Sequence, residues 1–427
     1  MLDIKFIRAN TKQVKEAAKN KNIKVDIDEL LRLDDERREL QQKIDELRTQ
    51  RNKLAEAGKG GKPAAKQIME GKKLKEEIAK LEKQSGEVDE KYWELMDKVP
   101  NLVHPDSPIG KDDSENVEIE RVGEPTKFKF TAKDHLTLAA ELDLIDFETA
   151  AQTSGTGFYY FKNEMVFLEL ALVRYAFDKL VGLPAQAGKG FVPFITPDMA
   201  RGFAMSGTGF NPRGNEDQIY QIKDEDLSLI ATAEITLGGY LANKTLREED
   251  LPIKYVGLSH CFRKEAGAYG KESRGLYRVH QFSKVEMFMF STPKQSEKLH
   301  EEMKEIEKEI YQELGIPIRV MAICSGDLGA PAYRKYDLEA WMPFKNSWGE
   351  ITSCSNCTDY QARRLNIKYK TAAGESGFVH TLNGTAITSS RVPLAILENF
   401  QTADGSVKIP KILHKYLPEG MKIIAKK

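Results

Sequence analysis

Hydrophobic residues recur at alternating steps of three and four positions along two stretches of the first hundred residues. The members of the two stripes are Leu33, Arg37, Leu40, Ile44, Leu47, Arg51 and Leu54, followed by Leu74, Ile78, Leu81, Ser85, Val88, Tyr92, Leu95 and Val99. This spacing is typical of coiled-coil seams, which tolerate an occasional polar residue. Because a break rich in Gly and Lys at residues 58–63 separates the stripes, the pattern predicts an antiparallel helical hairpin over residues 28–99.

The hydrophobic pattern changes beyond this arm. A linker is marked by Pro100, Pro105 and Pro108. Apolar runs then alternate with turn-rich segments and a few amphipathic helices, one of them over residues 165–181. The apolar runs at 255–258 and 279–285 flank a loop with three glycines, Gly267, Gly270 and Gly275. They predict an antiparallel hairpin with a long connection. The expected fold class is therefore α+β, with an N-terminal coiled-coil arm and a domain built on an antiparallel β-sheet flanked by helices.

Charge along the arm changes what the coiled coil is expected to do. The whole chain of 427 residues has a net charge of −1, but residues 48–83 hold eleven Lys or Arg against five Asp or Glu. The two stem segments, 28–47 and 84–99, are net acidic. A structural or dimerising coiled coil would explain the periodicity alone. A basic tip on an acidic stem instead favours a tip that meets a polyanion.

Length and composition limit the kind of protein that this chain can be and the cellular compartment in which we expect it. The length suggests two or three domains, and the N-terminal residues MLDIKFIRANTKQ contain no apolar signal segment. The most apolar helical stretch, 165–183, carries Glu169, Arg174 and Asp178, so we do not expect it to span a membrane. Four cysteines do not predict a disulfide framework, and a reducing cytoplasm is the simplest expectation.

Several polar residues are candidates for chemistry. Arg263 ends the first apolar run of the hairpin and Glu286 ends the second, an arrangement suited to an anion and a small polar molecule. Thr232 and Glu234 precede a helical stretch at 235–243, where helix capping is the simpler interpretation. Glu350 and the hydroxyls after it suit Mg²⁺ or a plain polar edge strand.

Two other motifs do not lead to a site. Cys354 and Cys357 form a single CxxC, and Cys261 and Cys324 stand alone, so neither zinc nor redox chemistry is expected. The GKGGKP segment at 58–63 lacks the spacing of a phosphate-binding P-loop.

The 262–286 stretch, FRKEAGAYGKESRGLYRVHQFSKVE, resembles motif 2 of the class II aminoacyl-tRNA synthetases. Residues 383–400, in which Arg391 opens an apolar helix-like run, resemble motif 3, and 165–197 resembles motif 1. The surrounding residues are similar to the seryl-tRNA synthetase family over essentially the whole chain. The resemblance implies a tRNA-binding domain at 1–105 and a class II catalytic domain at 106–427.

The resemblance also implies the reaction. Serine and ATP would give seryl-adenylate and pyrophosphate, and serine would then pass to the 3′ end of tRNA(Ser) and of tRNA(Sec). ATP would be a substrate, Mg²⁺ a cofactor, and motif 1 the interface of a homodimer. A class II paralogue that loads an amino acid onto a carrier protein is the alternative, but such relatives lack the long arm. A catalytically inactive relative is disfavoured by the intact set of polar residues.

Site roles follow from the resemblance residue by residue. L-serine would contact Thr232, Ala233, Glu234, Arg263, Glu286 and Thr385. ATP would contact Arg263, Lys264, Glu265, Val279, Phe282, Glu350, Ile351, Thr352, Ser353 and Arg391. Arg263 and Arg391 would be catalytic, and Glu350 and Ser353 would bind Mg²⁺. Many bacterial relatives have Ser in place of Thr385, and both residues keep the hydroxyl.

Overall fold

The computed structural model describes residues 1–57, 65–182, 190–210, 218–265 and 275–426. The chain divides into two compact units, Met1–Leu102 and Val103–Lys427. The Gly- and Lys-rich break at 58–63, and Gly267 and Gly270 of the long hairpin connection, lie outside the described residues.

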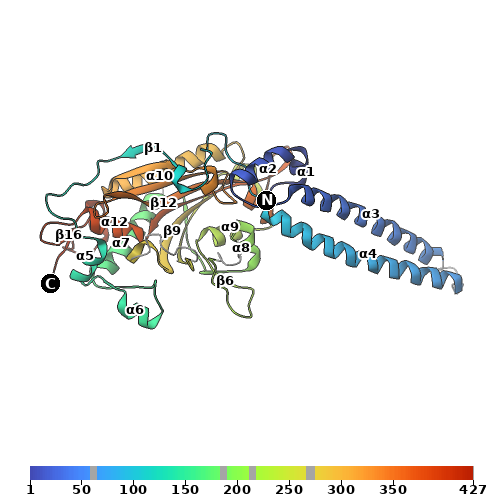
Figure 1. The fold of residues 1–427 in the computed structure, drawn as a ribbon, viewed down its shortest axis with the longest axis horizontal. Coiled ribbons are helices and arrows are strands. Elements are labelled where there is room, and N and C mark those ends of the chain that lie inside the picture. The colour runs from blue at the N-terminus through green and yellow to red at the C-terminus, as the bar shows by residue number, and fades with distance from the viewer. Residues whose placement is uncertain (58–64, 183–189, 211–217, 266–274, 427) are drawn as a thin grey trace. The chain divides into compact units, whose positions relative to one another are not determined.

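The described residues of the first unit form four helices: α1 (Ile4–Ala9), α2 (Thr11–Asn20), α3 (Ile27–Ala57) and α4 (Ala65–Lys98). Helices α3 and α4 lie side by side as an antiparallel pair (Figure 1), which confirms the predicted hairpin. Leu40 and Ile44 of the first stripe and Val88 of the second are buried, as the heptad spacing requires. Arg37 is tolerated in the seam because its guanidinium lies 4.0 Å from the centre of the Tyr92 ring and pairs with Asp89.

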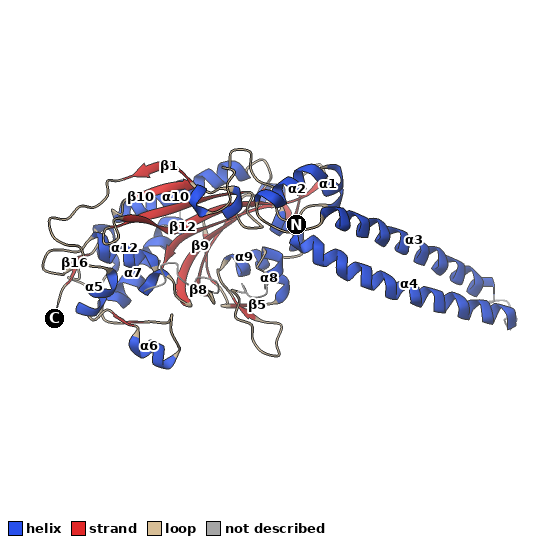
Figure 2. Cartoon of the chain, in the orientation of Figure 1, coloured by secondary structure: helices blue, strands red, loops and turns tan. Residues whose placement is uncertain are grey.

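An eight-stranded sheet organises the second unit (Figure 2). Its strand order is β1 (Val117–Val122), β10 (Ile318–Ala322), β11 (Arg334–Met342), β12 (Ser347–Thr358), β15 (His380–Thr388), β9 (Gln281–Ser291), β8 (Ile253–Phe262) and β4 (Val192–Ile195). Every neighbouring pair is antiparallel except β4 with β8, which is parallel. The predicted α+β class, with an antiparallel sheet, is confirmed.

The longer helices of this unit pack on the sheet: α7 (Glu164–Val181), α10 (Ser296–Leu314) and α12 (Arg391–Asn399). The remaining elements are α5 (His135–Glu141), α6 (Glu148–Thr153), α8 (Gly202–Thr208), α9 (Glu234–Tyr240), α11 (Tyr360–Arg364), β2 (Ile145–Asp146), β3 (Tyr160–Phe161), β5 (Met199–Ala200), β6 (Ser228–Leu229), β7 (Thr245–Arg247), β13 (Lys368–Lys370), β14 (Ser376–Phe378), β16 (Val407–Lys408) and β17 (Ile423–Ile424). Five 3-10 turns complete the described residues, at Asp113–Glu115, Glu248–Asp250, Gly275–Tyr277, Ser325–Asp327 and Lys411–Tyr416. The largest apolar cluster lies between the sheet and its helices.

The predicted hairpin is formed by β8 and β9, which pair antiparallel from Ile253 opposite Phe290 to Phe262 opposite Gln281. Gly275 lies where the chain re-enters the described structure, with a φ of +69°. A Cβ atom there would sit 2.3 Å from His135 Nε2, so only glycine fits.

The helix predicted at 235–243 is shorter, since α9 ends at Tyr240. Asn243 adopts a φ of +61°, which a continuing helix does not allow.

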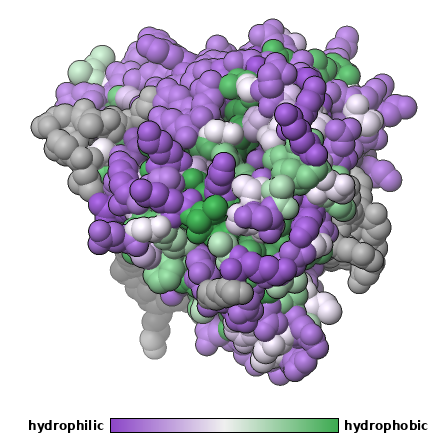
Figure 3. Space-filling view, turned by 90° about the vertical axis from the view of Figure 1, so that its left-hand side faces the viewer, coloured by the Kyte–Doolittle hydropathy of each residue, from purple (hydrophilic) through white to green (hydrophobic). Residues whose placement is uncertain are grey.

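Hydrophilic side chains cover most of the surface in Figure 3, with smaller hydrophobic areas between them. Among the described helices, none has both the length and the apolar character needed to cross a bilayer.

Candidate active site

A cavity of about 240 Å³ lies over the middle strands of the sheet. Its walls come from β9, β11, β12 and β15, from Arg263 just after β8, and from the starts of α9 and α12. Most of the predicted site residues line it: Thr232, Glu234, Arg263, Glu265, Val279, Phe282, Glu286, Glu350, Ile351, Thr352, Ser353, Thr385 and Arg391. Residues spread over 160 positions of sequence therefore meet in one place, because the strands that carry them are neighbours in the sheet.

Two predicted residues do not contribute side chains to this cavity. Ala233 is fully buried in an apolar cluster behind it. Lys264 donates its backbone N–H to the carbonyl of Gln218 at 3.1 Å, and its ammonium lies 5.9 Å from the centre of the Tyr220 ring.

Glu234 forms one corner of the cavity, at the first residue of α9. Its Oε1 accepts hydrogen bonds from Gln361 Nε2 at 2.6 Å and Asn383 Nδ2 at 3.0 Å. Burial raises the pKa of Glu234 to about 7, and the nearby charge of Glu286 acts in the same direction. The Thr232 hydroxyl accepts the backbone N–H of Glu234 at 3.2 Å, so Thr232 also caps this helix start, as its position in the sequence favoured.

Glu286 forms a second acidic corner, on β9. Its Oε2 accepts a hydrogen bond from the Thr385 hydroxyl at 3.0 Å and pairs with Lys284 Nζ at 2.6 Å. All three side chains are at most 7% exposed. The cavity therefore has a polar floor in which a carboxylate, a hydroxyl and an ammonium are already arranged around one point.

Arg263 enters the cavity from the end of β8. Its guanidinium donates to the carbonyl of Ala231 at 3.4 Å and lies 5.2 Å from the centre of the Phe282 ring. The neighbouring Glu265 accepts from Arg278 Nη1 at 2.9 Å and adopts a φ of +49°. Left-handed backbone at a non-glycine residue is costly and is often found at functional sites.

Arg391 and Glu350 form the opposite, charged wall. Arg391 Nη1 lies 3.1 Å from Glu350 Oε1, and its guanidinium is 4.9 Å from the centre of the Tyr277 ring. Burial alone would raise the pKa of Glu350. The cations Arg391, Lys335 and Arg263 outweigh burial and lower that pKa to about 2, so the carboxylate stays ionised.

Seven further side chains line the cavity without having been predicted: Phe210, Tyr277, Lys284, Lys335, Asn383, Thr388 and Ser390. Lys284 could have been found, since it lies two residues before Glu286 and strand alternation puts both on one face. Asn383 and Ser390 belong to the segment that was singled out around Thr385. Lys335 and Phe210 carry no local signal, because they reach the cavity only through the order of strands and the packing of α8.

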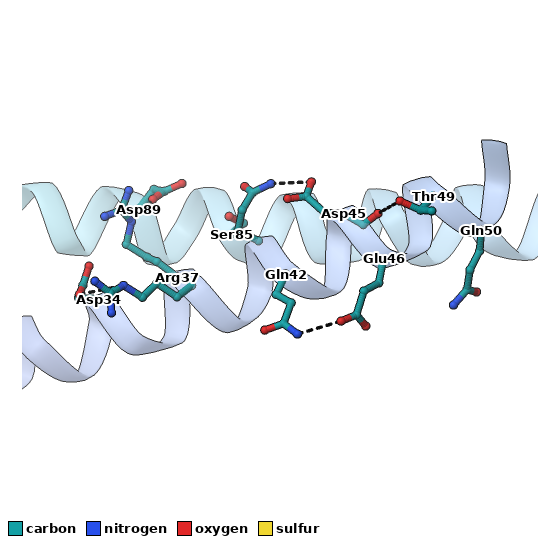
Figure 4. Close-up of a pocket in the computed structure, with 11 residues that line it drawn as sticks. Asp34, Arg37, Gln42, Asp45, Glu46, Thr49, Gln50, Ser85 and Asp89 are labelled. Carbon is teal, nitrogen blue, oxygen red and sulfur yellow. Dashed lines mark hydrogen bonds and ion pairs between the residues drawn. The ribbon is translucent and has the colours of Figure 1, made fainter. Parts of the chain in front are cut away.

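A second hollow, of about 940 Å³, runs along α3 and α4 in the first unit (Figure 4). Its acidic residues Asp34, Asp45, Glu46 and Asp89 outnumber its basic residues, Arg37 and Arg38. Such a lining repels a nucleotide, and we assign no chemistry to it.

No group of three or more His, Cys, Asp or Glu side chains suited to a metal ion occurs in the part of the chain that the structure describes. The four cysteines are buried thiols that form no disulfide with one another.

Comparisons with known proteins agree with this geometry. Residues 1–103 match the family model "Seryl-tRNA synthetase N-terminal domain", and residues 218–400 match "tRNA synthetase class II core domain (G, H, P, S and T)". A serine–tRNA ligase of Treponema denticola is 52% identical over 421 residues, covering 97% of this chain and 98% of the relative. One from Dictyoglomus turgidum is 53% identical over 422 residues and covers 98% of both chains.

Solved structures give the same result. The seryl-tRNA synthetase of Pyrococcus horikoshii, complexed with ATP, superposes with a TM-score of 0.88 at 41% identity and covers 100% of both chains. The cytoplasmic serine–tRNA ligase of Naegleria fowleri, in complex with AMP, has a TM-score of 0.83 at 32% identity, over 100% of this chain and 99% of the other.

Proposed function

The chain belongs to the seryl-tRNA synthetase family, and from this premise we propose how its own residues ligate serine to tRNA. The protein is an enzyme, an aminoacyl-tRNA synthetase that uses ATP as a substrate. One observation carries the residue assignments: two arginines and four carboxylates of the predicted set line a single cavity.

Activation brings two anions together, the serine carboxylate and the α-phosphate of ATP, and negative charge grows on phosphate oxygens as pyrophosphate leaves. The site therefore needs fixed cations more than a general base. Arg263 suits this role because a guanidinium binds oxygens two at a time. Its guanidinium lies 5.2 Å from the centre of the Phe282 ring and donates to the Ala231 carbonyl, and these contacts hold it at the cavity before substrates bind.

ATP would extend from Arg263 toward Arg391. We assign the γ-phosphate end and one face of the adenine to Arg391, and the other face to Phe282. Glu265 and the backbone of Val279 would contact the adenine edge, with Lys264 beside them. Ile351 and Thr352 would line the same wall, on β12.

Serine would be held between the two acidic corners. Glu234 and Thr232 suit its ammonium group, and Glu286 with Thr385 suits its hydroxyl. A site built to hydrogen-bond a hydroxyl rejects the amino acid that lacks one, because the buried polar groups are then left unpaired. Ala233 would act through its backbone, since its side chain faces the apolar cluster.

The charged wall fits Mg²⁺. Glu350 is ionised, and Ser353 supplies a second oxygen in the same cavity, which is the ligand chemistry that this ion prefers. When bound, Mg²⁺ would neutralise phosphate charge. Glu350 and Ser353 would hold it, while Arg391 keeps the Glu350 carboxylate in place.

We assign tRNA binding to residues 1–105, through the basic tip at 48–83, and propose tRNA(Ser) and tRNA(Sec) as partners. A homodimer through motif 1 is supported by apolar side chains that have no cover in the single chain. Phe167 and Leu170 on α7 are 46% and 60% exposed, and Ile195 on β4 is 84% exposed. The expected cytoplasmic location stays a prediction.

ATP–pyrophosphate exchange with each of the twenty amino acids tests the proposed site. We expect exchange with serine alone. Exchange that is fastest with a different amino acid would contradict the assignment of Glu286 and Thr385 to a hydroxyl.

A further inference from the structure

A fully buried carboxyl lies behind the proposed serine pocket. Glu307 belongs to α10, which packs on β15 and β12, and 0% of it is exposed. Neither of its oxygens has a hydrogen-bond partner among the described residues. A charge held there without a partner would be very costly, which is why such groups are neutral in proteins. Burial raises the pKa of Glu307 well above its usual value, and the nearby Glu286 and Asp337 act in the same direction.

A glycine lets Glu307 approach the strand that carries Thr385. A Cβ atom at Gly384 would lie 2.8 Å from Glu307 Oε1 and 2.5 Å from Met303 Sδ. Because successive strand residues face opposite sides of a sheet, Gly384 faces α10 while the next residue, Thr385, faces the cavity. A Cβ atom at position 384 would force the side chains of Met303 and Glu307 away from this strand.

One hydroxyl connects the buried acid with the pocket. Glu307 faces the Thr352 hydroxyl and the Cys354 thiol on β12. The Thr352 hydroxyl donates its single proton to the backbone carbonyl of Thr385, so that proton is not available for Glu307. The Thr385 hydroxyl in turn donates to Glu286. A proton on Glu307 would supply the missing donor to Thr352 Oγ and complete a chain of hydrogen bonds from α10 to Glu286.

We propose that Glu307 is a positioning residue of the serine pocket: as a neutral acid it donates to Thr352, which holds the Thr385 backbone and so sets the spacing between Thr385 and Glu286. The inference rests on the proposed assignment of Thr385 and Glu286 to the serine hydroxyl. Glu307 itself touches no substrate.

The test compares two substitutions in pyrophosphate exchange. Glu307→Gln keeps a neutral donor, and its KM for serine should stay within about twofold of the parent. Glu307→Met keeps similar volume but removes the donor, and should raise the KM for serine about three- to tenfold, the scale of one buried hydrogen bond. The KM for ATP should stay within about twofold in both. Met303→Leu, which alters packing against the same glycine without a donor, should leave both KM values at the parental level.

Two further variants separate the possible failures. Thr352→Val removes the connecting hydroxyl without changing α10, so it tests the chain even if Glu307→Met does not fold; an unchanged KM for serine would overturn the proposal. In the double variant with Glu307→Met, the KM for serine should rise little beyond that of either single variant, because both residues act through the same chain of hydrogen bonds. Thr385→Val tests the pocket itself. If it raises the KM for serine while Glu307→Met does not, the inference fails and the pocket stands; if Thr385→Val has no effect, the pocket assignment fails.

Discussion

Glu234 and Glu286 line the same cavity with the same chemical group, but their surroundings give them different properties. Glu286 is paired with an ammonium, whereas Glu234 has only amide donors and lies in a buried corner. Two carboxyl groups in such different surroundings usually have different tasks in a site. The ammonium of serine would supply the cation that Glu234 lacks, so binding and ionisation of Glu234 are coupled.

Serine binding should therefore weaken in mild acid. The pKa of Glu234 is raised to about 7, so the group gains a proton as pH falls below that value and can no longer pair with an ammonium. With ATP saturating, the KM for serine in pyrophosphate exchange should rise by up to roughly tenfold per pH unit below 7. Glu234→Gln should have a high KM that changes little with pH. The exposed Glu225→Gln should follow the parent, and a parental KM that is flat between about pH 5.5 and 8 would contradict this role.

Residues whose chemistry is local could be predicted from the sequence, and residues that act through packing could not. Arg263, Glu286, Glu350 and Arg391 stand in recognisable segments, and all four line the cavity. Lys335 lies 15 positions before Glu350 and reaches the cavity only because β11 pairs with β12. Glu307 looks like any charged residue of an amphipathic helix, and its close approach to Gly384 on a strand nearly 80 positions away carries no signal in the sequence.

At the scale of elements, the arm was the most predictable part because its contacts repeat along the sequence. A step of three or four residues defines the seam of each helix, and the seam contains the buried residues Leu33, Leu40, Ile44, Ile78, Val88, Tyr92 and Val99. The sheet is different, since its strands pair residues as far apart in the sequence as Val117 on β1 and Ala322 on β10. Apolar runs indicated that strands exist but carried no information about their order.

The seam of the arm should be sensitive to single substitutions. Ile44 is 3% exposed, and Ile44→Ala should cost about 2–5 kcal/mol of local stability through lost burial and a cavity. Hydrogen exchange of the full chain should show faster exchange in α3 and α4, with β8 and β9 unchanged, because each unit has its own core. Lys43→Ala, at an exposed neighbouring position, is the matched control. Equal protection in the two variants would mean that Ile44 is not part of a packed seam.

At the scale of the whole molecule, the cavity proposed for serine and ATP and the basic segment 48–83 belong to different units. The cavity is built from residues of Val103–Lys427, and the basic tip belongs to Met1–Leu102. A polyanion bound at the tip would be recognised by charge, with a strong dependence on salt, whereas serine and ATP are recognised by fitted polar groups. The two kinds of binding should therefore be separable by deletion.

Removing residues 48–83 and joining the stem helices with a short Gly turn should separate the two half-reactions. Arg48 Nη2 lies 2.7 Å from Glu82 Oε1, so the cut ends face each other across the arm and can be joined without moving the stem. Leu40, Ile44, Val88 and Tyr92 remain to hold the shortened pair together. Serine-dependent pyrophosphate exchange should stay within a few-fold of the parent, while charging of tRNA should fall by orders of magnitude.

The deletion changes both the length and the charge of the arm, so a second variant is needed to identify the cause. Replacing the exposed Lys72, Lys73 and Lys75 with Gln keeps the helix and removes only charge. If these residues contact phosphates, each loss should reduce the slope of log affinity for tRNA against log salt by about one unit. A shallower slope in the Gln variant, with normal exchange and an unchanged circular dichroism spectrum, would assign tRNA binding to the charge of the tip. Parental charging by the deletion variant would instead mean that the arm is a structural coiled coil, the interpretation that its periodicity alone allows.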